Sequence, residues 1–502
     1  MANVVAAFGM VFDPYVLWVI FASAIFGLFV GAVPGLTATM ATALLVPVTF
    51  FMPPVPAIAS IVTATAMAIF AGDIPSCFLR MPGTPASAAY TDEAYAMTKK
   101  GQGEIALGAG LVFSVIGGLF GTAVLILAAP VLAEVALKFS SFEYFWLVLL
   151  GLSCAVFIAV GDPLKGIVSL LIGLLVSAVG LDNPAAHPRF TFGNSELAGG
   201  LTLIPIMIGM FAVSEIMRSA STIDAPWEMA KAEVGNVFKG MGRLILKYPL
   251  AILRGSALGT AIGALPGAGA DIAAWMSYAM SKKFSKEPEK FGTGHVEGIV
   301  ESGAANNSAL AGAWIPALVF GIPGDSITAI VIGVLYIKGL NPGPTTFIEN
   351  AASIYAIFIV FVLANLLMLP LGVAAIKCAK QMLRVPRNVL IPIILLFCIV
   401  GSFAINNSAF GVILMLIFGT VAWLMEENGF PVAPAILGMV LGAMLEENFI
   451  SSMIKADGKL GGFFERPIAL GLAVTTLVVF GWPLVAWLWR QKRSLTRRAG
   501  TG

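Results

Sequence analysis

The sequence has few charged residues, few cysteines and almost no histidine. Of its 502 residues 11% are charged and 59% are hydrophobic, whereas a soluble protein carries about 25% charged residues. The four cysteines lie far apart, in or beside apolar runs, and the two histidines have no second ligand at metal-binding spacing. We therefore interpret the cysteines as packing residues and expect no metal site. The composition excludes an ordinary soluble fold and indicates a chain that faces lipid.

Motifs of common enzymes are missing as well. There is no P-loop, so ATP hydrolysis is not expected. A Ser/His/Asp set cannot be assembled at membrane depth, which argues against an intramembrane hydrolase. The segment Met1–Pro14 lacks the basic region of a cleavable signal, so we expect the first apolar stretch to remain. We predict no catalytic residues and no cofactor, and we conclude that the chain is not an enzyme.

Long apolar stretches are what the sequence has instead. They recur from Val16 to Trp489, and each is long enough to cross a hydrocarbon core of about 30 Å. Lipid offers no hydrogen bonds to the backbone, so such stretches must be helical. The sequence predicts an all-α polytopic membrane protein with about 12 membrane segments.

The chain contains an internal repeat. Gly31–Ala38 (Gly-Ala-Val-Pro-Gly-Leu-Thr-Ala) recurs as Gly263–Ala270 (Gly-Ala-Leu-Pro-Gly-Ala-Gly-Ala). Three further matches follow in the same order. Pro75 and Pro82-Gly83 recur as Pro316 and Pro323-Gly324, Lys100-Gly101 recurs as Lys338-Gly339, and Gly166 and Gly173 recur as Gly411 and Gly419. Four matches in one order predict two repeats, residues 1–218 and 248–453, joined by a cytoplasmic linker, 219–247. Residues 454–502 would add a periplasmic loop, a final transmembrane helix and a basic cytoplasmic tail.

Basic residues indicate that the two repeats have opposite orientations. The loop Lys377–Arg387 has four basic residues, whereas its counterpart Glu134–Phe142 has only Lys138. The loop Ser281–Lys290 has four lysines, and its counterpart Phe51–Val55 has none. Short cytoplasmic loops collect Lys and Arg, so corresponding loops lie on opposite sides of the membrane. The sequence thus predicts inverted-topology repeats, as in many secondary transporters.

Each repeat is predicted to begin with a hairpin. Basic residues predict that the linker and the loop Ser281–Lys290 are both cytoplasmic. The segment Leu250–Met280 between them must therefore enter and leave the membrane on the cytoplasmic side. It is either two full helices or a re-entrant hairpin that turns at Pro266-Gly267. By inversion, Val16–Phe51 does the same from the periplasmic side and turns at Pro34-Gly35.

Broken helices are the candidate substrate and ion site. Glycine and proline free backbone amides and carbonyls, which are tolerated at membrane depth only where protein or water receives them. The amides at a helix start suit anions, and unwound carbonyls suit Na⁺. We predict that substrate and ion bind at Gly35, Thr37, Pro82, Gly83, Thr84, Ser87, Gly267, Gly269, Asp271, Pro323, Gly324, Asp325 and Ser326, together with the adjacent amides of Asn306 and Asn307. The alternatives are that the glycines permit close helix packing and that either asparagine joins helices.

Two residue roles near the breaks follow from this prediction. Gly83 and Gly324 would let a ligand approach the backbone, because any Cβ would fill the space that the substrate needs. Arg80 is either a bidentate counter-charge for a carboxylate, or a residue that reaches the membrane interface or pairs with Asp73.

The sequence resembles the large membrane subunit of the tripartite tricarboxylate transporters (TctA-type). The resemblance rests on Gly31–Gly35, on Pro82–Pro85 with Lys100–Gln102, and on the long run Glu301–Pro344, which joins Glu-Ser-Gly-Ala-Ala-Asn-Asn, Gly-Ile-Pro-Gly-Asp and Gly-Leu-Asn-Pro-Gly-Pro. It implies uptake of citrate or another small carboxylate across the bacterial inner membrane, driven by Na⁺ or H⁺. It also implies two partners, a small membrane subunit and a periplasmic solute-binding protein. The residues alone leave open a stand-alone carboxylate carrier or channel without a binding protein.

Overall fold

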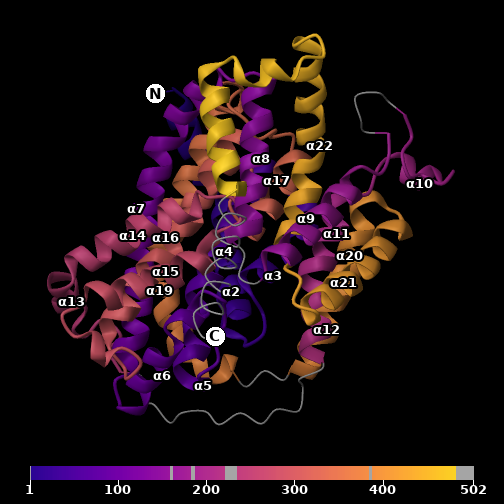
Figure 1. Cartoon of the computed structure of the whole chain (residues 1–502). Helices are drawn as coiled ribbons and strands as arrows, with labels where there is room; N and C mark the ends of the chain where they lie inside the picture. The colour runs from indigo at the N-terminus through magenta and orange to yellow at the C-terminus, as the bar shows by residue number, and fades with distance from the viewer. Residues whose placement is uncertain (1, 159–161, 182–186, 221–234, 384–386, 482–502) are drawn as a thin grey trace, which may run out of the picture. The chain divides into compact units, whose positions relative to one another are not determined.

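The computed structural model describes residues 2–158, 162–181, 187–220, 235–383 and 387–481 (Figure 1). In these ranges the regular structure is helical, apart from one isolated bridge between Gly180 and Arg189. The prediction of an all-α protein is therefore confirmed. The predicted basic tail, and residues 221–234 of the predicted linker, lie outside the described residues.

Six described helices are long and apolar enough to cross a membrane. They are Pro14–Ala32, Pro54–Leu79, Gly103–Ala136, Ala351–Ala379, Ala409–Glu427 and Val432–Lys455. Seven further apolar helices have 10–17 residues each. The chain is thus a multi-pass membrane protein, and the number of about 12 segments stays a prediction.

The helices form two compact units, and each unit takes helices from both halves of the chain. The first comprises residues 1–137 and 202–428, and the second comprises 138–201 and 429–502. The helices of the first unit are α1 (Ala2–Val11), α2 (Pro14–Ala32), α3 (Ala38–Phe50), α4 (Pro54–Ala71), α5 (Asp73–Leu79), η1 (Ser87–Ala89), α6 (Thr91–Lys99), α7 (Gly103–Ala136), α11 (Leu203–Ile208), η2 (Gly209–Val213), α12 (Ser214–Ala220), α13 (Met241–Lys247), α14 (Pro249–Gly263), α15 (Gly269–Phe284), η3 (Pro288–Lys290), α16 (Val296–Phe320), α17 (Ser326–Ile337), α18 (Thr346–Glu349), α19 (Ala351–Met382), α20 (Arg387–Asn406) and α21 (Ala409–Glu427). The predicted boundaries 1–218, 219–247, 248–453 and 454–502 stay predictions.

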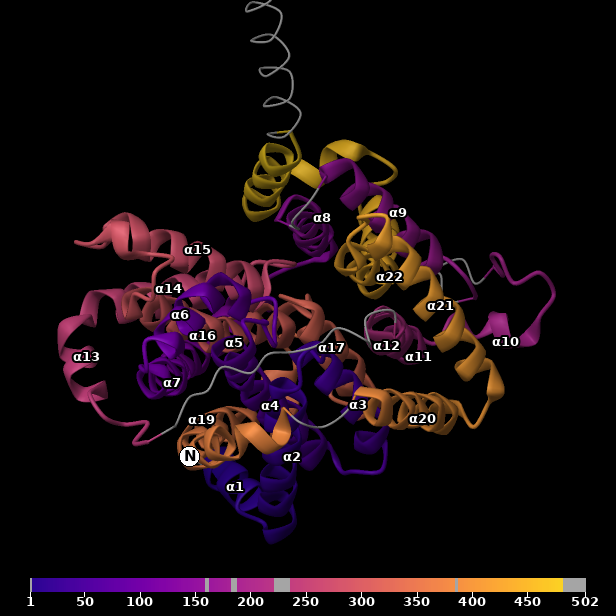
Figure 2. The ribbon, with the colours of Figure 1, turned by 90° about the horizontal axis from the view of Figure 1, so that it is seen from below.

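Helix α16 is the centre of the first unit. It is buried from Glu297 to Val319, and α7, α14 and α15 pack around it, as Figure 2 shows from below. Glycines let these helices approach closely. A Cβ added to Gly121 of α7 would lie 2.6 Å from the Ser308 carbonyl oxygen, and one on Gly263 of α14 would lie 2.8 Å from the Ala309 Cα. Small residues at such contacts maximise helix packing where lipid supplies no hydrophobic drive.

The second unit is built on α22 (Val432–Lys455), which packs against α8 (Ser141–Ile158) and α9 (Pro163–Ser177). It also contains α10 (Ser195–Ala198), η4 (Leu460–Phe464) and the helix Pro467–Gly481. The Trp146 indole donates to the Phe463 carbonyl at 3.0 Å. Arg189 binds Glu446 with two hydrogen bonds, at 2.8 and 2.7 Å.

The cysteines fit the predicted packing role in part. Cys77, Cys154 and Cys398 are buried and Cys378 is exposed, and all four are free thiols.

Candidate functional site

The first break lies between α5 and α6 and closes on a reciprocal pair of hydrogen bonds. Helix α5 ends at Arg80, which takes a left-handed conformation (φ 56°). Beyond it, the Thr84 amide donates to Ser87 Oγ at 3.1 Å, and the Ser87 amide donates to Thr84 Oγ1 at 3.2 Å. Both side chains are buried. The predicted hydroxyls therefore satisfy the backbone that the break exposes.

The second break, between α16 and α17, has the same construction. Helix α16 ends at Gly321 (φ 68°). The Asp325 amide donates to Thr328 Oγ1 at 2.9 Å, and the Thr328 amide donates to Asp325 Oδ1 at 2.8 Å, which makes a complete capping box for α17. Asp325 as a whole residue is half-buried.

The glycines of the breaks are packed against other backbone. A Cβ on Gly83 would lie 2.5 Å from Gly72 Cα and 2.8 Å from the Gly31 carbonyl oxygen. A Cβ on Gly324 would lie 2.5 Å from the Gly263 carbonyl oxygen and 2.7 Å from Ala313 Cα. Protein, not open space, therefore faces each glycine. These contacts are what the alternative of close helix packing expects.

The hairpin tips meet the breaks. Gly35 and Gly267 have φ values of 89° and 82°, which a residue with a Cβ rarely adopts. Thr37 accepts from the Met40 amide at 3.2 Å and so caps α3. In the second hairpin, the Gly267 amide donates to the Gly324 carbonyl at 2.8 Å, and a Cβ on Gly269 would lie 2.8 Å from Asp325 Cβ.

Residues from three segments converge here. Asp271 lies in the first turn of α15, and its carboxylate lies near the Ala86 backbone and near Asp325. Asp271 is exposed. We call residues 82–87, 267–271 and 323–326 the break cluster. It contains two carboxylates and neither lysine nor arginine, so attraction for an anion must come from amides or from a bound cation.

The two asparagines lie inside α16. Both are buried, and their carboxamides have different surroundings: Asn306 donates to the Tyr90 hydroxyl at 3.4 Å, and Asn307 donates to the Met368 sulfur at 3.5 Å. Among the described residues neither asparagine forms a hydrogen bond with the break cluster, whereas Tyr90, a residue not predicted from the sequence, directly follows η1.

Two arginines form ion pairs that were not predicted from the sequence. Arg80 pairs with Asp92 at 2.8 Å, not with Asp73, and both side chains are more than 60% exposed. Arg254, missed from the sequence, binds the fully buried Glu301 through two hydrogen bonds, one of 2.6 Å. Glu215 pairs with Arg218, and Glu446 pairs with Arg189.

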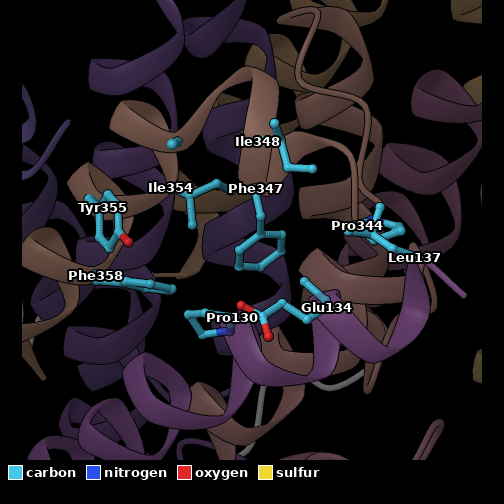
Figure 3. Close-up of a pocket in the computed structure, with 11 residues that line it drawn as sticks. Pro130, Glu134, Leu137, Pro344, Phe347, Ile348, Ile354, Tyr355 and Phe358 are labelled. Atoms are coloured by element: carbon cyan, nitrogen blue, oxygen red, sulfur yellow. The ribbon is translucent and has the colours of Figure 1, made fainter.

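A separate pocket opens near the end of α7 and has a volume of about 190 Å³. Figure 3 shows Glu134, Phe347 and Tyr355 around it. Apart from the Glu134 carboxylate and the Tyr355 hydroxyl its lining side chains are apolar. Because Glu134 would repel a carboxylate, the chemistry of this pocket does not suit an anionic substrate.

Comparison with known proteins gives the family. Residues 17–437 match the Tripartite tricarboxylate transporter TctA family. The chain belongs to this family. As a TctA family member it is a membrane component of a tricarboxylate transporter, and the resemblance inferred from the motifs is confirmed.

Relatives cover most of the chain. A protein of Agrobacterium vitis described as an uncharacterized 52.8 kDa protein in the TAR-I ttuC' 3' region is 34% identical over 457 residues, 91% of each chain. A second, described as an uncharacterized protein in the TAR-II ttuC' 3' region of the same organism, is 34% identical over 224 residues, 44% of this chain and 93% of its own length. No solved structure matches.

Proposed function

We propose that this TctA family protein is the translocating subunit of an ion-coupled secondary transporter for tricarboxylates or related small carboxylates. It would work in the bacterial inner membrane with a small membrane subunit and a periplasmic solute-binding protein. The observation that supports this most is the convergence of both helix breaks on Asp271 and Asp325. A site made from two interrupted helices and a hairpin tip is typical of such transporters.

The proposal includes inverted repeats, and matched contacts support it. Gly83 meets Gly31 and Gly72, whereas Gly324 meets Gly263 and Ala313, at equivalent places in the repeated motifs. The lysine at the end of each repeated motif, Lys100 or Lys338, also makes an equivalent contact. Lys338 donates to the carbonyls of Phe50 and Met52 at 2.9 and 2.7 Å, and Lys100 donates to that of Thr293 at 2.6 Å. Each lysine thus binds the loop that follows the hairpin of the other repeat.

The second hairpin is re-entrant in this proposal. Helix α14 has 15 residues and α15 has 16. At 1.5 Å per residue these helices are about 22–24 Å long, shorter than a hydrocarbon core of about 30 Å. The tip of this hairpin would therefore end inside the membrane, where the break cluster lies. In the first hairpin α3 is also short, with 13 residues, whereas α2 has 19 and is long enough to span.

Asp271 and Asp325 would hold the coupling cation. Two interacting carboxylates without a basic partner in the cluster favour a cation, Na⁺ or H⁺, and the cation would then attract the substrate carboxylate. Because the Thr84, Ser87 and Thr328 amides are already bonded, the cation has a larger part in binding than the sequence analysis expected.

An uptake assay tests the whole proposal. The purified protein, reconstituted in proteoliposomes with its proposed membrane partner, should accumulate labelled citrate or another di- or tricarboxylate only when the binding protein and an imposed Na⁺ or H⁺ gradient are both present. Flux through the large subunit alone, without binding protein or gradient, would contradict it and indicate a stand-alone carrier or channel.

Asp325 allows its structural and ionic roles to be separated. Asn also caps helices well, so Asp325→Asn should keep the cap and the folded protein but lose cation-dependent uptake. Asp325→Ala should additionally lose about 0.5–2 kcal/mol of stability through the missing cap. The measurements are uptake against cation concentration and thermal unfolding. Unchanged cation dependence in Asp325→Asn would exclude Asp325 as a cation ligand.

The inverted topology predicts the side on which single cysteines react. In a background with the exposed Cys378 replaced by alanine, cysteines at Ser285 and Gln381 should react with an impermeant maleimide only after the cytoplasmic face is opened. Cysteines at Ser140 and Asn194 should react in intact cells with a permeable outer membrane. If Ser140 and Gln381 report the same side, the repeats are not inverted.

A further inference from the structure

A second buried polar group lies next to the break cluster. Asp73 begins α5, directly after Gly72, against which Gly83 packs. It lies within the apolar span Pro54–Leu79 and is 2% exposed. The Tyr90 hydroxyl donates to Asp73 Oδ1 at 2.6 Å, and the Asn306 amide donates to that same hydroxyl at 3.4 Å. Three side chains from α5, α16 and the start of α6 thus form one chain of hydrogen bonds.

Two oxygen atoms of this chain are unsatisfied. Asp73 Oδ2 and Asn306 Oδ1 are buried without a hydrogen-bond partner. Helix α7 leaves room for Asp73 Oδ2 because it has a glycine there, since a Cβ on Gly110 would lie 2.5 Å from that oxygen. A buried polar atom without a partner costs free energy, and for Asp73 Oδ2 this cost falls when the carboxyl group is protonated and neutral.

No described basic side chain forms an ion pair with Asp73. Helices α2 and α4, which pack against α5, have no charged residue, and the titratable groups that interact with Asp73 are Tyr90 and Cys77. The charged residues of α6 and α7 interact elsewhere: Asp92 with Arg80, Glu93 with Tyr278, Lys99 with Tyr95 and Glu104 with Lys239, while Glu134 lines the separate pocket. An ionised Asp73 would therefore be a buried charge without a partner, which is costly at membrane depth.

The second break is built without a carboxylate at the place that corresponds to Asp73. Asp73 precedes Gly83 by ten residues, and Trp314 precedes Gly324 by the same interval. Trp314 packs edge-on against Phe361, with ring centroids 5.2 Å apart. The second break is therefore built with an aromatic residue at the place where the first has an aspartate, which favours a role for Asp73 other than packing.

We propose that Asp73, hydrogen-bonded to the Tyr90 hydroxyl that Asn306 also contacts, binds a proton that is co-transported with the carboxylate. A proton suits the group better than a metal ion, because hard metal ions collect about six oxygen ligands and only two oxygens here are unpaired. Proton binding would neutralise Asp73 beside Gly72, which contacts Gly83 and Thr84 in the first break. The charge state of Asp73 is thereby linked to the break cluster through a direct backbone contact. This inference rests on the proposed function and adds a second coupling site, at Asp73, to the one proposed at Asp271 and Asp325.

The test separates proton-driven accumulation from exchange. Asp73→Asn has the shape of the protonated carboxyl and stays neutral. We expect it to lose ΔpH-driven accumulation of labelled citrate, or of the first di- or tricarboxylate that the wild-type complex accumulates. It should keep counterflow exchange of the same substrate, which needs no net proton movement. Asp92→Asn, which removes an exposed carboxylate paired with Arg80, is the matched control and should retain both activities.

A second variant covers the case in which Asp73→Asn does not fold. Tyr90→Phe removes the donor to the ionised carboxylate, so Asp73 should hold its proton more tightly and the pH midpoint of uptake should move upward. A purely structural role of Tyr90 would change the yield and leave the pH midpoint in place. ΔpH-driven accumulation in Asp73→Asn at the wild-type level, or an unmoved midpoint in Tyr90→Phe, overturns the inference. If the wild-type complex shows neither accumulation nor counterflow of any carboxylate, the proposed function itself fails.

Discussion

Gly83→Val and Gly324→Val are each expected to lose uptake together with folded protein. The sequence analysis expected these glycines to admit a ligand, but the added Cβ would lie 2.5 Å from Gly72 Cα in one case and 2.5 Å from the Gly263 carbonyl oxygen in the other. Both neighbours are backbone and cannot rotate away. Overpacking of a filled interior costs about 1–3 kcal/mol and sometimes more, and a clash with backbone belongs at the upper end.

The measurements are the yield of inserted protein, its size-exclusion profile and its uptake. Gly83→Ala should be less affected than Gly83→Val, because alanine adds only the Cβ. Gly471→Val, on the apolar helix Pro467–Gly481, is the matched control and should behave as wild type, because no atom of a neighbouring segment lies within 4 Å of the added Cβ. Valine variants that remain inserted and monodisperse but do not transport would contradict the packing role and support a ligand-approach role.

Arg254→Met should destabilise the protein by about 3–5 kcal/mol, because it leaves a buried carboxylate without its partner. Glu301 is fully buried on α16, and Arg254 reaches it from α14 with a side chain that is 25% exposed. The pair joins the first helix of the second hairpin to the central helix of the first unit. The free energy of unfolding in mixed micelles measures the effect.

Replacing both residues distinguishes a charge effect from lost packing. The double variant Arg254→Met/Glu301→Met keeps similar volumes without charge and should recover most of the lost stability. Arg80→Met removes one partner of an exposed pair, with both side chains more than 60% accessible, and should cost at most about 1 kcal/mol. A double variant no more stable than Arg254→Met would mean that the unpaired charge is not the cause.

Local chemistry of the breaks was readable from the sequence. Asp325 and Thr328 stand three residues apart before an apolar helix, and Thr84 and Ser87 have the same spacing, so both reciprocal caps depend on neighbours along the chain. The positive φ of Gly35 and Gly267 likewise follows from a Pro-Gly turn. Caps and turns of this kind are determined by a few consecutive residues and can therefore be predicted from the sequence.

Partners that are distant along the chain were not readable in this way. Asp73 was considered with Arg80, which is seven residues away, yet it accepts a hydrogen bond from Tyr90, whose hydroxyl also accepts one from Asn306 of another helix. The Arg254–Glu301 pair and the contact of Ala86 with Asp271 join segments that the sequence places far apart. The rotation of each helix about its axis and the depth at which it packs select these partners. A sequence that is apolar on all faces of a helix predicts neither quantity.

The sequence by itself determined the all-α membrane class, the family and the positions at which helices break. A chain with 11% charged residues cannot cover a soluble surface, and lipid allows long apolar segments only helical structure. The tertiary structure alone decided which surface each glycine faces and which buried carboxylates have partners. These depend on atoms brought within a few ångströms by packing of α7, α14 and α15 on α16, and packing is a property of the assembled helices.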